Sequence, residues 1–274
     1  TRMKPPHWRH PPPARVFAEL AESDMESASR AAYLNARLIG QELAEVGISV
    51  DCLPVLDIPV VGAHEVIGDR ALGRDPETIG QLGKAMSEGI MAEGVLPIIK
   101  HIPGHGRAKS DSHKELPIVD TTRVVLESTD FRPFVSLANM PWAMTAHVVY
   151  TAIDDIHAAT ISPEIIENII RKEIGFEGLL LSDDIGMEAL SGTKGERAQA
   201  ILTAGCDLAL ECSGKIDDMT EVASIIPQMS NSALKRANEA EKLRVASLAN
   251  DGLSSETALK ELEDLMREHR IDGG

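Results

Sequence analysis

Two adjacent carboxylates, Asp183 and Asp184, directly follow the short apolar run at 178–182. An apolar run of this length, with glycine on one side and charge on the other, is typical of a buried strand in a parallel sheet. In α/β barrels the reacting groups lie at the carboxyl ends of such strands, so either carboxylate is a candidate nucleophile or base. The alternative is that one of them caps the helix that follows.

A second group of reactive residues lies in the loop at 101–117. Asp111 and His113 are close enough there for the carboxylate to accept a hydrogen bond from the imidazole, which would orient the ring for acid/base catalysis. A metal site is one alternative, because His101 and His105 have the i, i+4 spacing of helical ligands. Proline and glycine in the same segment exclude a helix, so that spacing has no geometric meaning. A solvent-facing polar loop is the other alternative.

Three further side chains could bind a polar ligand. Lys100 lies where a predicted strand meets its loop, and His147 ends another predicted strand. Arg70 follows a glycine on a loop, and its planar guanidinium suits hydroxyls or carboxylates. An exposed lysine and a surface salt bridge are the ordinary alternatives for Lys100 and Arg70.

The composition excludes several classes of protein. The 274 residues are 43% hydrophobic but only 3% aromatic, and they carry a net charge of -16. This favours a globular chain with an aliphatic core, in one large α/β domain or two small ones. The acidic balance disfavours binding to nucleic acid or to an anionic membrane.

The cysteines and the apolar segments bear on location. Cys52, Cys206 and Cys212 are scattered and lack Cys-x-x-Cys spacing. We therefore expect neither a disulfide framework nor a structural zinc site, and a reducing cytoplasm fits best. We recognise no signal peptide and no apolar stretch near the roughly 18 residues that a membrane span needs.

Apolar segments alternate with helical patterns along the chain. Strands are expected at 48–57, 95–99, 142–149, 178–182 and 206–211. Helices are expected at 14–46, 78–94, within 121–139, at 162–174, at 188–204, from 217 onward and at 257–269. This alternation predicts a parallel sheet built from βαβ units, whose rim would carry Asp57 and the other polar residues that follow strands.

The whole chain is expected to be one catalytic domain, 1–274. Residues 1–13 contain five prolines and are predicted to be an irregular surface segment. Residues 217–274 are predicted to be a helical C-terminal part. No Gly-x-Gly-x-x-Gly follows the first strand and no Gly-Lys-Ser/Thr occurs, so a nucleotide-binding fold gains no support.

Several motifs, in this order, resemble those of glycoside hydrolase family 3. The segment 169–186 contains Ile-Ile-Arg-Lys-Glu, then Gly-Leu-Leu-Leu-Ser-Asp and a further glycine, and is similar to the active-site signature of that family. The segment Lys-His-Ile-Pro-Gly-His-Gly at 100–106, with Asp-Ser-His at 111–113, resembles the insertion of the bacterial β-N-acetylhexosaminidase branch. Segments 54–57, 67–70, 146–148 and 182–188 also match, so the resemblance spans residues 2 to about 211.

The resemblance implies the mechanism of a retaining glycosidase. Asp183 would be the nucleophile that forms a covalent glycosyl-enzyme, and Asp184 would be structural. His113, on a mobile loop with Asp111 as its partner, would be the general acid/base. The implied substrate-binding residues are Arg2, Arg70, Lys100, His101 and His147.

The implied fold is a TIM-type (β/α)8 barrel, but the five predicted strands fall short of eight. The family has an acidic, glycine-rich segment before the position of Arg2, and three barrel strands before the first one recognised here. We therefore expect an incomplete barrel that lacks its first three strands and has an exposed, aggregation-prone sheet edge. Smaller departures are Ile102, where phenylalanine is common, and Gly186, where serine is common.

The resulting functional prediction is a retaining exo-β-N-acetylglucosaminidase. It would remove terminal β-linked N-acetylglucosamine from peptidoglycan fragments in the cytoplasm during cell-wall recycling. A β-glucosidase or a glycoside phosphorylase of the same family is one alternative, and an inactive truncated remnant is another. No metal or organic cofactor is expected. The expected partner is a small-molecule carbohydrate, with no nucleic acid or membrane, and the protein is expected to be a monomer.

Overall fold

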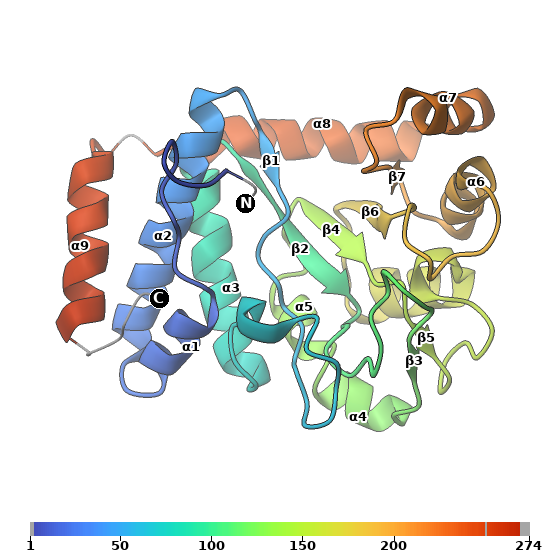
Figure 1. Cartoon of the computed structure of the whole chain (residues 1–274), viewed down its shortest axis with the longest axis horizontal. Helices are drawn as coiled ribbons and strands as arrows, with labels where there is room; N and C mark the ends of the chain where they lie inside the picture. Colours follow the sequence, from blue (N-terminus) through green and yellow to red (C-terminus); the bar gives the residue numbers. More distant parts are fainter. Residues whose placement is uncertain (1–2, 250, 269–274) are drawn as a thin grey trace.

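The computed structural model describes residues 3–249 and 251–268, and its centre is one curled parallel sheet. The sheet has the strand order β1–β2–β4–β6–β7, so the strands follow one another around the sheet as they do along the chain (Figure 1). Its strands are β1 (Val50–Asp51), β2 (Leu96–Ile102), β4 (Trp142–Thr145), β6 (Leu179–Asp184) and β7 (Leu208–Leu210). Within the described residues the two outer strands each pair on one side only. This half-barrel confirms the prediction of an incomplete (β/α) barrel.

The pairing register separates two faces of the sheet. Ile99 is opposite Ala143, which is opposite Leu180, and all three belong to the large core shared with the helices. Their neighbours on the strands, such as Met144 and Leu181, point to the other face and form a separate cluster there. This second face is the inner face of the half-barrel. Side chains alternate along a regular strand, so residues two positions apart share a face.

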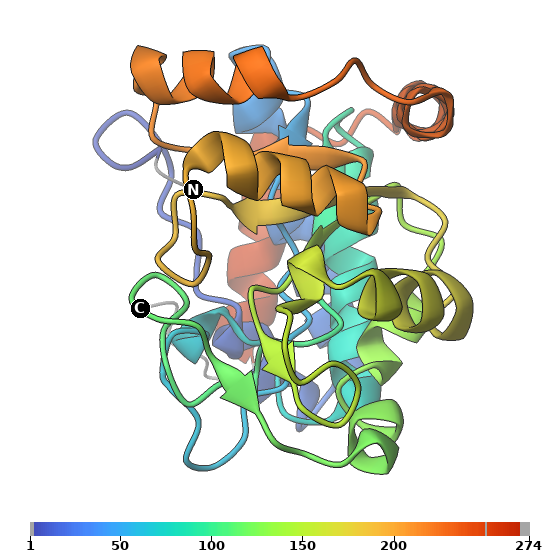
Figure 2. The ribbon, with the colours of Figure 1, turned by 90° about the vertical axis from the view of Figure 1, so that its right-hand side faces the viewer.

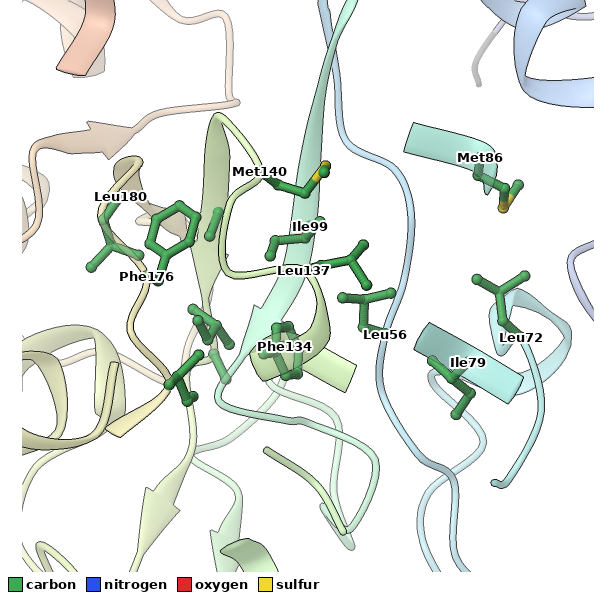
Figure 3. Packing of buried hydrophobic residues seen from close by; sticks show 14 of the residues in the cluster. Leu56, Leu72, Ile79, Met86, Ile99, Phe134, Leu137, Met140, Phe176 and Leu180 are labelled. Atoms are coloured by element: carbon green, nitrogen blue, oxygen red, sulfur yellow. The ribbon is translucent and has the colours of Figure 1, made fainter. Parts of the chain in front are cut away.

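Helices cover the outer face of the sheet. The main ones are α2 (Met25–Glu45), α3 (Pro76–Met91), α5 (Arg132–Ser136) and α6 (Lys194–Ala204). Figure 3 shows how the core is filled: Leu56, Ile79 and Phe134 meet side chains of the sheet and of the neighbouring helices. The fully buried large side chains are mostly aliphatic, in line with the composition.

The remaining helices frame this core. They are α1 (Arg15–Ala21), α4 (Arg123–Ser128), α7 (Ile216–Ile225), α8 (Asn231–Ala246), α9 (Ser255–Glu268), the short 3₁₀ turns η1 (Gly68–Arg70) and η2 (Ala159–Ile161), and the π-helix η3 (Ile165–Glu173). Helix α8 crosses the amino ends of the strands, where Arg236 bonds to the Glu177 carbonyl (Figures 1 and 2). Helix α9 lies against α2, where Arg30 pairs with Glu261 at 2.6 Å. None of the helices in the described ranges is long and apolar enough to cross a membrane.

Three predicted strands are shorter in the structure than expected, and one of them is 206–211, where only β7 pairs. The segment 48–57 was predicted to be one strand, but only β1 pairs regularly, because Pro54 has no N–H to donate to a neighbour. The chain stays extended after it, and Val55 forms a single bridge with Lys100. The segment 142–149 divides into β4 and a separate strand β5 (Val149–Tyr150), which pairs with β3 (Ile118–Val119) in a small sheet that the pattern did not predict.

One predicted helix is divided in two, and another begins later than expected. The stretch 14–46 is interrupted before α2, because the side chain of Asp24 accepts hydrogen bonds from the backbone of Glu26 and Ser27 and starts a new helix. The stretch 188–204 becomes helical only from Lys194, where Thr193 and Glu196 form a reciprocal capping box. In the predicted helix 162–174, the regular part η3 is wound with i to i+5 hydrogen bonds.

Candidate active site

Asp183 lies at the carboxyl end of β6, at the rim of the half-barrel. Its side chain lines one cavity together with His101, which comes from β2. Its Oδ1 accepts a hydrogen bond of 2.8 Å from the backbone N–H of Asp184. The side chain is only 13% exposed, so the strand presents a carboxylate that is largely removed from water.

A histidine stands between Asp183 and a second, fully buried carboxylate. His101 Nδ1 lies 2.7 Å from Oδ2 of Asp57, and His101 Nε2 lies 3.7 Å from Oδ2 of Asp183. His101 comes from β2, and Asp57 follows the extended segment after β1. These two segments are held together by the backbone bond from Leu56 N to the Lys100 carbonyl, at 2.7 Å. The structure therefore places the His101 imidazole between two carboxylates, one from the segment after β1 and one from β6, which β4 separates from β2.

His101 stabilises the ionised forms of both carboxylates. Burial by itself would raise the pKa of Asp183, but His101 and, after it, His147 and the Asp184 N–H hold that pKa below its usual value. Burial likewise acts to raise the pKa of Asp57, and the nearby His101 outweighs it, so this pKa is also lowered. Both carboxylates are therefore ionised at neutral pH, as a nucleophilic carboxylate has to be.

Two other histidines nearby are kept neutral. Burial lowers the pKa of His105 to about 4, and it also lowers the pKa of His147. His147 Nε2 lies 3.0 Å from the carbonyl of Asp184, and because a carbonyl only accepts, Nε2 carries the proton. Nδ1 of each ring is buried and has no hydrogen-bond partner among the described residues. His147 is fully buried and does not line the cavity described next.

A small cavity opens beside Asp183. Its volume is about 160 Å³, below the roughly 300 Å³ at which pockets for drug-sized ligands begin. The enclosed space thus suits one small group of a ligand whose remainder lies outside. Its wall contains Arg70, Lys100, His101, His105, His113 and Asp183, with Val66, Ile67, Ser112 and Met187 as the other lining residues. Arg70 is exposed and is steadied by a 2.5 Å bond to the Val66 carbonyl.

The loop after β2 brings His113 to this cavity. Asp111 Oδ1 accepts a bond of 3.0 Å from the backbone N–H of His113 and lies 2.9 Å from its ring Nδ1. The first of these bonds and then the ring lower the pKa of Asp111. The carboxylate requires a proton on Nδ1, which leaves Nε2 of this 62% exposed ring able to exchange a proton. Ser112 is buried and contacts Met187 at 3.7 Å, so the loop is attached to the segment after β6.

Asp184 has a different role from its neighbour. Its Oδ1 accepts backbone hydrogen bonds from Gly186, at 2.9 Å, and from Cys212, at 3.2 Å. It therefore ties the turn after β6 to the segment after β7, and it is absent from the wall of the cavity. This geometry supports a structural role for Asp184.

The predicted residues are thus largely brought together. The cavity is lined by Asp183, His113, Lys100, His101 and Arg70. Asp111 is not part of its wall but is hydrogen-bonded to the ring of His113. Arg2 lies outside the described residues. Asp57 and His105 also belong to this site, although no catalytic or substrate-binding role was predicted for either. The available signal for Asp57 was its position directly after a strand, and for His105 its place in the glycine-rich loop. In the described part of the chain no group of three or more His, Cys, Asp or Glu side chains could hold a metal ion.

Several larger depressions lie elsewhere on the described surface, and two of them are beside α8 and α1. One, of about 660 Å³, is beside α8, where Arg171 is already paired with Asp207. The other, of about 750 Å³, is beside α1, where Arg15 pairs with Glu19. Neither contains a strand-end carboxylate with a proton donor, so the small cavity is the better candidate despite its size.

Fold and site together define a class: an open (β/α) half-barrel with a nucleophile-like carboxylate at the end of one strand and a histidine–aspartate pair on the loop after another strand. The chain belongs to glycosyl hydrolase family 3, since residues 9–248 match the N-terminal domain of that family.

Curated relatives carry the name Beta-hexosaminidase. The protein of Chromobacterium violaceum is 37% identical over 220 residues, which is 79% of this chain and 61% of the relative. The protein of Alkalilimnicola ehrlichii is 38% identical over 216 residues, 77% of this chain and again 61% of the relative. The chain therefore spans about three fifths of the length of these relatives.

Solved structures show the same fold. NagZ from Neisseria gonorrhoeae in complex with N-trifluoroacetyl-D-glucosamine has a TM-score of 0.82 at 30% identity, covering 95% of this chain and 77% of that one. A family 3 β-N-acetylglucosaminidase from Paenibacillus also has a TM-score of 0.82, at 28% identity, covering 98% of this chain and 54% of that one.

Proposed function

We propose that this site is that of a retaining exo-β-N-acetylglucosaminidase. The observation that carries the proposal is that Asp183, a desolvated ionised carboxylate, and His113, an imidazole held by Asp111, line one cavity. The names of the relatives support an N-acetylhexosamine as the sugar, and so does the N-acylated glucosamine bound in the Neisseria gonorrhoeae structure.

The reaction takes two steps in this proposal. In the first, Asp183 attacks the anomeric carbon, the glycosidic C–O bond breaks, and His113 gives its Nε2 proton to the departing oxygen. In the second, His113 takes a proton from water, and the resulting hydroxide displaces Asp183 from the anomeric carbon. Two inversions at the same carbon retain the β configuration.

The other cavity residues hold the sugar. Lys100 and Arg70 present cationic donors to sugar hydroxyls, and His101 presents Nε2 close to the nucleophile. The cavity encloses only one small group, which favours removal of a terminal sugar over cleavage within a chain. We propose peptidoglycan fragments as the substrates and cell-wall recycling in the cytoplasm as the setting.

The experiment is hydrolysis of a chromogenic N-acetyl-β-glucosaminide. His113→Ala is expected to lower kcat/KM by about 10²–10⁴-fold when the leaving group is poor and much less when it is a good nitrophenolate. His157→Ala is the matched control, because His157 is also exposed and bonded to a nearby carboxylate, Asp154, but lies away from the cavity. Equal losses in both variants, or full activity in His113→Ala, contradict the assignment. Turnover that requires inorganic phosphate identifies a phosphorylase instead.

A further inference from the structure

We propose that the buried Asp57 is a positioning residue that keeps His101 doubly protonated and positively charged beside Asp183. The proposed nucleophile would then work next to a cation that the fold itself maintains. Asp57 is fully buried and does not line the cavity, so it reaches the cavity only through His101 and through the backbone of His105. The kinetic part of this inference rests on the proposed function, whereas its charge state can be measured without any substrate.

The surroundings of Asp57 favour its ionised form. Its Oδ1 accepts the backbone N–H groups of His105, at 2.6 Å, and of His101, at 3.2 Å. Its Oδ2 lies 2.7 Å from Nδ1 of His101. Three donors converge on one buried carboxyl group, which is the arrangement that favours its ionised form. Because an ionised carboxylate only accepts, Nδ1 of His101 must carry a proton.

The surroundings of Nε2, the other ring nitrogen of His101, favour a proton there as well. Nε2 of His101 faces Oδ2 of Asp183 at 3.7 Å. With Nδ1 already protonated, a neutral ring would point the lone pair of Nε2 at a carboxylate oxygen. A proton on Nε2 replaces this repulsion by attraction between opposite charges, in a site where little water screens them. The His101 side chain is 8% exposed, and the two carboxylates that flank it are less than 15% exposed.

The remaining titratable groups around His101 leave it as the cationic imidazole. They are His105 on the same loop, His147 after β4 and Lys100 next in the chain. Burial lowers the pKa of His105 and of His147, and repulsion from His101 adds to this in both cases. Of the three rings only His101 contacts two carboxylates, so the charge is assigned to it and not to its neighbours.

This arrangement affects the two chemical steps unequally. A neighbouring cation makes Asp183 less basic, and a less basic carboxylate is a better leaving group when the glycosyl-enzyme breaks down. Without the cation, Asp183 becomes a stronger nucleophile but a poorer leaving group. Loss of Asp57 is therefore expected to slow the second step more than the first.

Asp57→Asn removes the charge and keeps the hydrogen bonds. The amide oxygen can still accept the two backbone N–H groups, and the amide N–H can donate to Nδ1 of His101. The ring then becomes neutral with its proton on Nε2. Asp130→Asn is the matched control, because Asp130 is also buried and holds the same loop through Arg107, but it does not contact His101.

The direct test is ¹⁵N NMR of the histidine side chains at pH 7, with His101→Gln used to assign the signals. We expect protons on both ring nitrogens of His101 in the wild type and in Asp130→Asn, and on one nitrogen in Asp57→Asn. A singly protonated His101 in the wild type overturns the inference, even if Asp57→Asn fails to fold. A doubly protonated His101 in a folded Asp57→Asn overturns it as well.

The kinetic test uses the same variants. Asp57→Asn is expected to lower kcat about tenfold or more, as loss of a carboxylate behind a functional imidazole commonly does, and to lower KM with it. The acidic limb of the kcat/KM profile, which reports the free enzyme, should move up by about one pH unit, because removing a cation raises the pKa of the Asp183 carboxylate. Equal effects of Asp130→Asn contradict a specific role. Absence of any turnover in the wild type, with His101 doubly protonated, rejects the proposed function and leaves the charge assignment standing.

Discussion

Gly106 is the residue whose replacement tests the geometry of the site most sharply. It lies between His105 and the segment that carries Asp111 and His113, and its backbone runs against that of Ile58. A Cβ atom at this position would lie 2.7 Å from the backbone nitrogen of Ile58 and closer still to the carbonyl group of that residue. No flexible side chain can move aside, so the two backbone segments must separate.

The expected cost follows from this overlap. Overpacking of a tight site typically costs about 1–3 kcal/mol, so Gly106→Ala should lower the free energy of unfolding by about 2 kcal/mol. In a domain of this size that corresponds to a fall in Tm of about 4–8 °C. The separation also loosens the 2.6 Å bond from His105 N–H to Asp57, and a displacement near 1 Å in a reacting site can cost about 10²-fold in rate.

The assays are thermal unfolding followed by circular dichroism, and kcat/KM with a chromogenic N-acetyl-β-glucosaminide. Gly175→Ala is the control, because Gly175 has φ 77° and no other heavy atom within 4 Å of an added Cβ. That change should cost about 1 kcal/mol through the backbone and leave kcat/KM unchanged. The reasoning is refuted if Gly106→Ala unfolds at the wild-type temperature and keeps full activity.

Three further changes probe other parts of the structure. Tyr150→Phe removes the buried 2.6 Å bond from the hydroxyl to the Gly104 carbonyl and should cost about 1–3 kcal/mol in urea unfolding, whereas an unchanged midpoint would show that this bond adds nothing. Asp154→Ala should destabilise the protein at neutral pH. Hydrogen bonds from Ser162 and from the His157 and Ile156 backbone outweigh burial and lower the pKa of Asp154 from 3.8 to about 2. The stabilisation is therefore complete above pH 3.8 and lost as the pH falls through about 2, so acid unfolding curves of the two proteins should converge there, and parallel curves would argue against it. Arg236→Ala removes the 2.8 Å ion pair with Asp207 that attaches α8 to the strand ends, and limited proteolysis should then cut first around α8; an unchanged cleavage pattern would count against that attachment.

The positions of the main strands along the chain could be predicted from the sequence, whereas their exact first and last residues could not. An apolar run such as 178–182 predicts a buried strand from its composition, and β6 lies there in the structure. Pro54 shortened the first strand. The side-chain cap at Asp24 starts a second helix within the stretch 14–46, and the cap at Thr193 sets the start of α6. These are effects of single residues that an averaged pattern does not register.

The candidate site was predictable where its residues are close in sequence. Asp111 and His113 are two positions apart, and their hydrogen bond follows from that spacing. Asp57 and His101 are 44 positions apart, and only the parallel pairing of neighbouring strands brings them to 2.7 Å. The burial of His105 and His147, which decides that they stay neutral, likewise depends on what packs around them and not on their own segments.

The proposal that Asp183 is the nucleophile is tested most directly by trapping the covalent intermediate on this residue. The protein would be incubated with an activated fluorinated N-acetylglucosaminide, which forms the glycosyl-enzyme faster than water releases it, and then digested for mass spectrometry. We predict a mass increase of one sugar unit on the peptide that contains Asp183, and none in Asp183→Asn. An adduct on a different residue, or turnover of the natural linkage with no adduct at Asp183, would contradict the account.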